Sequence, residues 1–472
     1  MVGMRNTRLL NTRLLLTAAA AALLGACAST PVPAPAPTST FDPPVAATAP
    51  RPSQPRACPA EVPAGARCFT GEDASGAFYW IAIPRDWTPA AGVLVMHAHG
   101  GPADTGPAKP ERSEEDLKRW AVTVKAGYAW AGSTYRRGGY GITMAAEDTE
   151  RLRQLFVREF GQPRRTLLHG QSYGGGVASK AAELYATVDG KRGPYDGVLL
   201  TSSVLHGGNR AYDFRLDLRA VYQAVCKNHP KADEPQYPLW MGLPKDSKLT
   251  RAELAARVQE CTGLGKPVAQ RSELQKANLA TIVNVVKIPE RSVVGHLNWA
   301  TWLFHDLTQL RLGNRNPFGN TGVAYRGSAD DTALNATVLR YTADPAAAAT
   351  LARDSAPEGK VNVPVLAFHA INDPTAFVEL ESAYREVLQR AGTGGLLVQA
   401  FSDESEHSYL ADAQYPALFT ALLDWVDKGD KPTPQKVLAL CHGYEAAYGK
   451  GCRIQPAYQP PSLDSRVAPR GR

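Results

Sequence analysis

His169-Gly170-Gln171-Ser172-Tyr173-Gly174-Gly175-Gly176, residues 169–176, is the stretch that decides the fold of this chain. A short apolar run precedes it, and a run with apolar residues three and four apart follows it, which predicts a strand, a sharp turn and a helix. Side chains beside a serine at such a turn would clash with the crossing backbone, and Gly170 and Gly174 remove them. The pattern therefore puts Ser172 at the apex of a strained turn.

This strand, turn and helix resemble the nucleophile elbow of the α/β-hydrolase superfamily. The resemblance covers residues 78–426 and implies the α/β-hydrolase fold, with a mainly parallel sheet covered by helices on both faces and Ser172 as nucleophile. It is specific to the superfamily more than to any substrate, because one fold serves many chemistries. The alternative is a glycine-rich turn with an incidental serine.

A second glycine motif, His97-Ala98-His99-Gly100-Gly101-Pro102, ends another apolar run. Glycines at such a place allow backbone N–H groups to approach a reacting carbonyl oxygen. By the resemblance, the N–H of Tyr173 is one oxyanion donor and the N–H of Gly100 or Gly101 is the other, and the choice between the two glycines stays open. His97 and His99 are expected to brace this loop, since a catalytic base must reach the nucleophile.

The serine needs a base to act as a nucleophile at neutral pH. Among ten histidines, His407 has the fitting position, in a polar loop after the last strand-like run and before the last helical run of the core. Asp373 is the carboxylate in the loop after the preceding strand-like run, and the order serine, acid, histidine agrees with the resemblance. Two alternatives remain: Asp373 as a turn or helix-capping residue, and Glu404 or Glu406 in its place.

Alternating strand-like and helical runs extend over residues 57–203 and 361–430, which predicts a parallel sheet covered on both faces. Residues 204–360 lack this alternation and are expected to form a helical cap insertion over the carboxyl ends of the strands, where such sheets bind ligands. Residues 431–472 form a C-terminal extension. Aromatic residues of the insertion are expected either to roof an apolar cleft or to form the insertion's own core. They are Trp299, Trp302, Phe304 and Phe318.

Residues 1–27 have the pattern of an export signal, with arginines, an apolar run and then Leu24-Gly25-Ala26-Cys27. This ending resembles the lipobox of bacterial lipoproteins, which implies that Cys27 becomes the lipid-bearing N-terminus and that Ala28 directs the protein to the outer membrane. An ordinary signal peptide is the alternative. Residues 28–56 are rich in Pro, Ala, Ser and Thr, which predicts a disordered tether.

Six further cysteines form an even set, and an exported chain can form disulfides. We expect sequence neighbours to pair. The pairs are Cys58 with Cys68, Cys226 with Cys261, and Cys441 with Cys452. A zinc site is the weaker alternative, because no pair has the two-residue spacing of metal ligands.

The composition, with 44% hydrophobic and 21% charged residues, is that of a globular protein with a sizeable core. Part of the net charge of +7 comes from terminal arginines, including Arg466 and Arg470, which are expected outside the fold. The other basic residues are scattered among acidic ones, so no nucleic-acid partner is expected. The expected partners are a small ester or short peptide substrate and a membrane that holds the lipid anchor.

These patterns together predict a serine hydrolase of carboxylic esters that works through an acyl-enzyme and needs neither metal nor cofactor. A prolyl-type peptidase is the first alternative, because residues 99–102 and 170–175 are also similar to segments of prolyl peptidases. An aminopeptidase would need a cap carboxylate to bind the substrate amine, and Asp213, Asp217 and Asp306 are candidates. A non-catalytic binding lipoprotein of the cell envelope is the second alternative.

Overall fold

The computed structural model describes residues 41–42, 52–101 and 105–470, all within one compact unit. The predicted lipidation site Cys27 and most of the predicted tether lie outside the described residues. The three predicted disulfide pairs all form, as Cys58–Cys68, Cys226–Cys261 and Cys441–Cys452. Disulfides persist in oxidising compartments, so they indicate an exported or extracellular protein.

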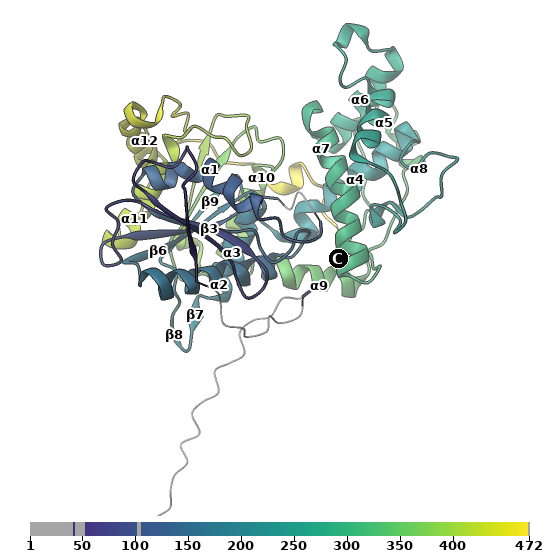
Figure 1. Cartoon of the computed structure of the whole chain (residues 1–472). Coiled ribbons are helices and arrows are strands. Elements are labelled where there is room, and N and C mark those ends of the chain that lie inside the picture. Colours follow the sequence, from purple (N-terminus) through teal and green to yellow (C-terminus); the bar gives the residue numbers. More distant parts are fainter. Residues whose placement is uncertain (1–40, 43–51, 102–104, 471–472) are drawn as a thin grey trace, which may run out of the picture. The chain divides into compact units, whose positions relative to one another are not determined.

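A nine-stranded sheet in the order β1-β2-β3-β5-β4-β6-β9-β10-β11 forms the core (Figure 1). The first four strands of this order pair antiparallel, and all pairs from β5 to β11 are parallel. The strands are β1 (Gln54–Arg56), β2 (Arg67–Glu72), β3 (Phe78–Ile83), β4 (Val93–Ala98), β5 (Ala129–Ser133), β6 (Arg165–Gln171), β9 (Gly197–Thr201), β10 (Val365–Ala370) and β11 (Leu397–Ser402). A two-stranded hairpin of β7 (Thr187–Val188) and β8 (Lys191–Arg192) stands apart.

Helices cover both faces of this sheet, because its strands carry apolar side chains on both sides. In β4, Leu94 and Met96 join one hydrophobic cluster and Val93 and Val95 join the other. The first cluster includes residues of α2 (Ile142–Phe160), α3 (Tyr173–Leu184) and α10 (Glu379–Arg390). The second includes residues of α1 (Glu111–Lys125), α11 (Gln414–Lys428) and α12 (Pro434–Tyr448). The predicted fold class, a mainly parallel sheet between helical layers, is confirmed.

Residues 204–360, the segment predicted as the cap, consist of helices and connecting loops. Its helices are α4 (Gly207–Cys226), α5 (Arg251–Thr262), α6 (Glu273–Val286), α7 (Val293–Asn298), α8 (Asp331–Thr337) and α9 (Pro345–Ser355). After α7 the chain forms two π-helical stretches, Trp299–Leu303 and Asp306–Arg311. Such wider turns occur often at functional sites.

The final cap helix, α9, is bound directly to the core. The carboxylate of Asp354 accepts the N–H groups of Ile142 and Thr143 at 3.0 and 3.2 Å, and the Thr143 hydroxyl donates to the Asp354 carbonyl at 2.9 Å. These N–H groups belong to the first turn of α2, which has no partner for them within the helix. The cap segment and the core therefore share buried hydrogen bonds.

Two expectations about the ends of the chain need correction. The predicted tether reached residue 56, but residues 54–56 form β1, whose backbone pairs with β2. The tail was expected outside the fold, but Arg470 donates to Asp217 at 2.6 Å and Arg466 to Glu379 at 2.9 Å. Buried carboxylates need cationic partners, and these two arginines supply them.

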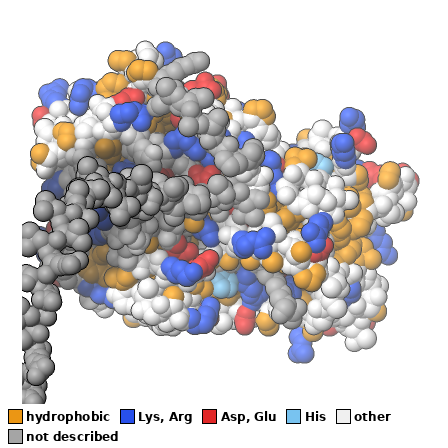
Figure 2. Space-filling model, turned by 90° about the horizontal axis from the view of Figure 1, so that it is seen from below, with side chains coloured by type: hydrophobic (Ala, Val, Ile, Leu, Met, Phe, Trp, Pro, Cys, Tyr) orange, Lys and Arg blue, Asp and Glu red, His pale blue; other side chains and the backbone are white. Residues whose placement is uncertain are grey.

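On the face seen in Figure 2, Lys and Arg side chains are interspersed with acidic, apolar and neutral ones. Among the residues that the structure describes, none of the helices has both the length and the apolar character that a bilayer crossing demands.

Candidate active site

The backbone at Ser172, between β6 and α3, has φ of 57° and ψ of −123°, a conformation that residues other than glycine rarely adopt. Neighbouring residues must be glycine for steric reasons. A Cβ on Gly170 would lie 2.2 Å from the Gly174 carbonyl oxygen, and one on Gly174 would lie 1.9 Å from the Ala98 carbonyl oxygen. The strained turn lifts the Ser172 side chain out of the sheet and keeps it near the end of β4.

His407 and Asp373 lie in line with the serine. His407 Nε2 is 2.7 Å from Ser172 Oγ, and its Nδ1 is 2.7 Å from Asp373 Oδ2. Ser172 and Asp373 are buried, at 8% and 7% exposure, while the His407 side chain is 18% exposed. Ser172, His407 and Asp373 lie in the loops that follow β6, β11 and β10, respectively. These loops lie together because the parallel strands end on the same side of the sheet. The chain has the α/β-hydrolase fold.

Asp373 is held in place by hydrogen bonds to both carboxylate oxygens. Its Oδ1 accepts the N–H groups of Thr375 and Ala376 at 2.7 and 3.0 Å, so the residue also closes the turn that sequence reasoning gave as an alternative. Its Oδ2 faces His407. Burial by itself raises the pKa of Asp373, but the charge and hydrogen bonds of His407 and His369 outweigh burial and hold this pKa well below its usual value.

A second histidine lies behind the acid, and the sequence analysis did not single it out. His369, on β10, is fully buried; its Nε2 is 3.4 Å from Asp373 Oδ2 and 2.9 Å from the Ala376 carbonyl oxygen, and its Nδ1 is 3.0 Å from Glu381 Oε1. Burial lowers the pKa of His369, but the charges and hydrogen bonds of the two carboxylates outweigh burial and raise this pKa to about 10. His369 is therefore a cation between two buried anions. Only the i,i+4 spacing of His369 and Asp373 in the strand-loop segment could have suggested it.

The oxyanion candidates lie beside the serine. Tyr173 is the first residue of α3, so its N–H has no acceptor within the helix. A Cβ on Gly100 would lie 3.3 Å from the Ser172 Cβ. The Gly100 carbonyl is bound by the His99 ring at 2.5 Å and by Arg112 at 3.2 Å. In a trans peptide the N–H points away from the carbonyl, so the N–H of Gly101 faces away from these two side chains.

His97, His99 and His169 are buried structural residues near this site. His97 and His169 face each other with their Nδ1 atoms 3.1 Å apart, and His169 Nε2 lies 3.0 Å from the Thr201 hydroxyl. Burial lowers the pKa of His99 and of His169 to about 3, so both are neutral. Of the two histidines expected to brace the glycine loop, His99 contacts it at the Gly100 carbonyl and His97 contacts His169 instead.

The loop that carries His407 is held by neighbours from the core and the cap. Gln171 donates to the Ser408 hydroxyl at 2.7 Å, and Arg119 donates to the Ser408 carbonyl at 3.0 Å. From the cap, Arg291 donates to the Ser405 carbonyl. The alternative acids have other tasks: Glu404 accepts from Gln414 at 2.8 Å and from the backbone of Ala411 at 3.0 Å. Glu406 lies 3.8 Å from Arg291.

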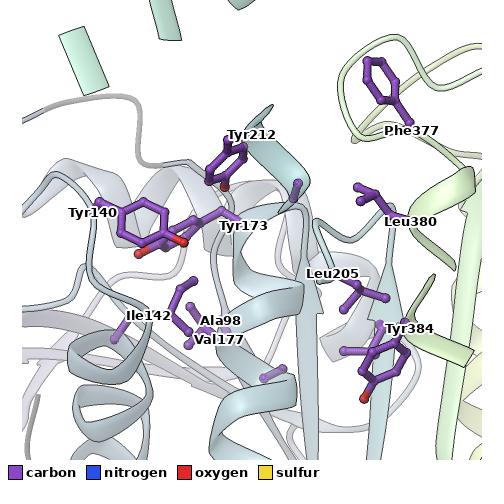
Figure 3. Packing of buried hydrophobic residues seen from close by; sticks show 14 of the residues in the cluster. Ala98, Tyr140, Ile142, Tyr173, Val177, Leu205, Tyr212, Phe377, Leu380 and Tyr384 are labelled. Atoms are coloured by element: carbon purple, nitrogen blue, oxygen red, sulfur yellow. The ribbon is translucent and has the colours of Figure 1, made fainter. Parts of the chain in front are cut away.

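Cap residues reach the acid loop and the oxyanion helix as well. His296 Nε2 is 3.0 Å from the Pro374 carbonyl oxygen, next to Asp373. Tyr212 lies beside Tyr140 and Tyr173 in Figure 3, with ring centroids of Tyr140 and Tyr212 5.9 Å apart. The Tyr173 hydroxyl accepts the N–H of Gly141 at 3.0 Å. His296 and Tyr212 of the cap segment therefore contact the surroundings of Asp373 and Ser172.

One group in the described residues has metal-ligand composition, His442, Glu445 and Cys452. The sulfur of Cys452 is bonded to Cys441, so it cannot act as a thiolate ligand.

No model of a known protein family matches this sequence, and no curated protein sequence matches it. Among solved structures, lipase A of Candida antarctica is similar at 13% identity, with a TM-score of 0.41 and coverage of 89% of this chain and 88% of the lipase. An esterase from Aspergillus oryzae is similar at 14% identity, with a TM-score of 0.40 and coverage of 78% and 81%. The acylaminoacyl peptidase of Pyrococcus horikoshii is similar at 12% identity, with a TM-score of 0.36 and coverage of 82% of this chain and 44% of the peptidase. Function is therefore argued from the site's own geometry.

Proposed function

We propose that this protein is a serine hydrolase that cleaves carboxylic esters through an acyl-enzyme, with Ser172 as nucleophile, His407 as base and Asp373 as the acid that orients it. The observation that carries the proposal is the continuous row of two 2.7 Å contacts from Ser172 Oγ through His407 to Asp373. A serine hydroxyl at neutral pH becomes nucleophilic only with such a base at hydrogen-bond distance.

In the first half of the reaction, Ser172 Oγ attacks the ester carbonyl while its proton passes to His407 Nε2. Asp373 accepts the Nδ1–H and stabilises the imidazolium that forms. The N–H of Tyr173, with that of Gly101 or Gly100, binds the developing oxyanion. His407 then protonates the leaving alcohol, and in the second half it activates the water that releases the acid.

The cap carboxylates are paired with arginines, which favours an ester substrate over a peptide whose free amino terminus must be bound. Asp217 accepts from Arg470 at 2.6 Å, Asp306 accepts from Arg311 at 2.9 Å, and Asp213 lies 3.8 Å from Arg210. An aminopeptidase needs a carboxylate that is available to a substrate ammonium group. None of the three aspartates that were candidates for this task lacks a cationic neighbour.

The test combines labelling with a substrate comparison. Ser172→Ala should abolish labelling by a fluorophosphonate probe and turnover of 4-nitrophenyl esters, with the thermal unfolding temperature of the wild type retained. Retained labelling refutes the assignment of the nucleophile. Faster cleavage of a proline 4-nitroanilide than of the esters would favour the prolyl-peptidase alternative, and a folded wild type that reacts with neither substrates nor probe would favour a non-catalytic binding protein.

We also propose that the protein is an outer-membrane lipoprotein anchored through Cys27, because residues 24–27 resemble a lipobox and three disulfides indicate export. Cys27→Ser should release the protein from the detergent-soluble membrane fraction into the soluble fraction. Retention of the variant in the membrane would contradict the anchor.

A further inference from the structure

Arg215, on the cap helix α4, is a buried cation with unsatisfied donors. The residue is 2% exposed, and its Nε and Nη1 have no hydrogen-bond partner among the residues that the structure describes. No carboxylate of those residues lies within 4.0 Å of its guanidinium. Buried charges in proteins are nearly always paired, so an exception of this kind requires an explanation.

Three partly buried arginines elsewhere in the fold have carboxylate partners. Arg136 donates to Asp148 at 2.6 Å, Arg470 to Asp217 at 2.6 Å and Arg311 to Asp306 at 2.9 Å. Each thus has the carboxylate that Arg215 lacks. Arg219, one turn further along α4, is also buried, and its Nε and Nη1 also have no partner among the described residues. Arg215 differs from it in the aromatic rings at its guanidinium, which lead towards the residues around Ser172.

Aromatic rings surround the guanidinium instead. Its central carbon lies 4.1 Å from the ring centroid of Trp299, 4.5 Å from that of Tyr212 and 4.9 Å from that of Phe214. The face of an aromatic ring attracts a cation. It does not accept the N–H groups in the plane of the guanidinium, as a carboxylate does. Burial lowers the pKa of Arg215 to about 10, although the Tyr212 hydroxyl raises it, so the residue is a cation at neutral pH.

Contacts on two sides join Arg215 to the catalytic row. On one side Trp299 packs on Tyr212 with ring centroids 4.2 Å apart, and Tyr140 packs on Tyr173, the neighbour of Ser172, at 5.7 Å (Figure 3). On the other side Phe214 packs on His296 at 4.9 Å. The His296 ring in turn binds the carbonyl next to Asp373, as described above.

We propose that Arg215 binds a carboxylate on the substrate, at a distance from the ester bond that Ser172 attacks. This inference rests on the proposed function and names its substrate class, which is esters that carry a free carboxylate. A carboxylate offers two acceptor oxygens to the guanidinium fork, and the low-polarity surroundings strengthen the pairing. The Trp299 ring covers the cation, is partly exposed and begins a π-helical stretch. The proposal requires this ring to move aside so that the substrate carboxylate reaches Arg215.

The experiment compares charged esters with neutral esters of the same shape. On the acyl side, mono(4-nitrophenyl) glutarate is paired with 4-nitrophenyl 5-methylhexanoate, in which an isopropyl group replaces the carboxylate. On the alcohol side, 4-(butyryloxy)benzoate is paired with 4-isopropylphenyl butyrate. The side on which the charge raises kcat/KM identifies which part of the ester carries the carboxylate. Salt of about 0.3 M keeps long-range attraction out of the ratio.

Arg215→Met should lower the anionic-to-neutral ratio of kcat/KM by about 10- to 100-fold for one of the two pairs, the range expected for hydrogen bonds to a charged group. Arg215→Lys should fall between, because an ammonium keeps the charge but not the fork. Arg219→Met is the matched control. Arg219 is as buried and lies one turn further on the same helix, and its Nε and Nη1 also have no partner among the described residues. Its Nη2 donates to the Tyr237 hydroxyl and the Gly242 carbonyl, both at 3.3 Å, and loss of this side chain should leave the ratio unchanged.

An unchanged ratio in Arg215→Met, or an equal fall in Arg219→Met, overturns the proposal. A second measurement uses the folded wild type and does not need turnover: glutarate should raise its thermal unfolding temperature more than neutral glutaramide at the same concentration, because a ligand stabilises the state that binds it. Arg215→Lys should reduce this difference, and equal effects of the two compounds also overturn the proposal. Failure of every ester to react would instead refute the proposed function, whatever the result with glutarate.

Discussion

The cation behind the catalytic acid gives the sharpest prediction about the chemistry of this site. His369→Gln keeps a side chain of similar length in β10 but removes the positive charge between Asp373 and Glu381. The two buried carboxylates then face each other without a cation, and the pair formed by Asp373 and His407 takes up a proton more readily. Because catalysis needs this pair without the extra proton, the acid limb of kcat/KM should move to higher pH.

The distance between the charges sets the size of the effect. At 3.4 Å, with an effective dielectric constant of about 20, two unit charges attract by about 5 kcal/mol. Reorganisation of the site absorbs part of this energy, so we expect a shift of at least about one pH unit, which corresponds to ~1.4 kcal/mol. The assay is the hydrolysis of a neutral 4-nitrophenyl ester between pH 5 and 9, with active enzyme counted by fluorophosphonate titration.

His97→Gln is the control, because His97 is an equally buried histidine at the end of the parallel strand β4 and has no carboxylate partner among the described residues. It should cost stability without moving the acid limb. If His369→Gln keeps the wild-type pH profile while remaining folded, the charge behind Asp373 has no part in the reaction and the reasoning is refuted.

Four further outcomes follow from contacts described above. The stability that wild type gains over His369→Gln should be complete below pH 6.5 and lost as the pH rises towards about 10, because folding raises the pKa of His369; urea unfolding at several pH values measures it, and a constant difference would contradict the linkage. Gly174→Ala should abolish fluorophosphonate labelling, since its Cβ would lie 1.9 Å from the Ala98 carbonyl oxygen, whereas Gly443→Ala, with open space around it, should label normally. Loss of Cys226–Cys261, which are 35 residues apart, should cost about 4 kcal/mol of unfolding free energy, against about 3 for Cys58–Cys68, which are 10 apart; the reverse order in denaturant titrations would refute the loop-entropy argument. Tyr173→Phe leaves the buried N–H of Gly141 without its acceptor and should cost about 1 to 3 kcal/mol in the same titration, and no loss would show that water replaces the hydroxyl.

The parts of the fold that local chemistry decides could be predicted from the sequence. Gly170 and Gly174 mark the strained turn because no other residue fits there, and the apolar strands are readable because both faces of the sheet are buried. The near-neighbour cysteines pair as expected, because short loops bring them together. The antiparallel edge strands β1 and β2 escaped prediction, since β1 is an exposed segment of three residues without an apolar pattern.

Residues whose importance arises from long-range contact could not be predicted. Arg215 is one of many arginines in the sequence, and its lack of a carboxylate partner among the described residues becomes visible only in the folded structure. His369 lies within the apolar run of β10, and its charge depends on Glu381, a residue of α10 that follows a turn. The two π-helical stretches also follow from packing, because their sequence has the spacing of an ordinary helix.

The hydrogen bonds between the cap and the loops that carry His407 and Asp373 have a consequence for protein engineering. Arg291 donates to the loop that carries His407, and the His296 ring contacts the loop that carries Asp373, so both loops are held by the same short stretch of the insertion. A variant without residues 204–360 would keep Ser172, Asp373 and His407 but lose the two contacts that help to align them. Grafting a foreign lid onto this scaffold therefore requires rebuilding these two anchors first.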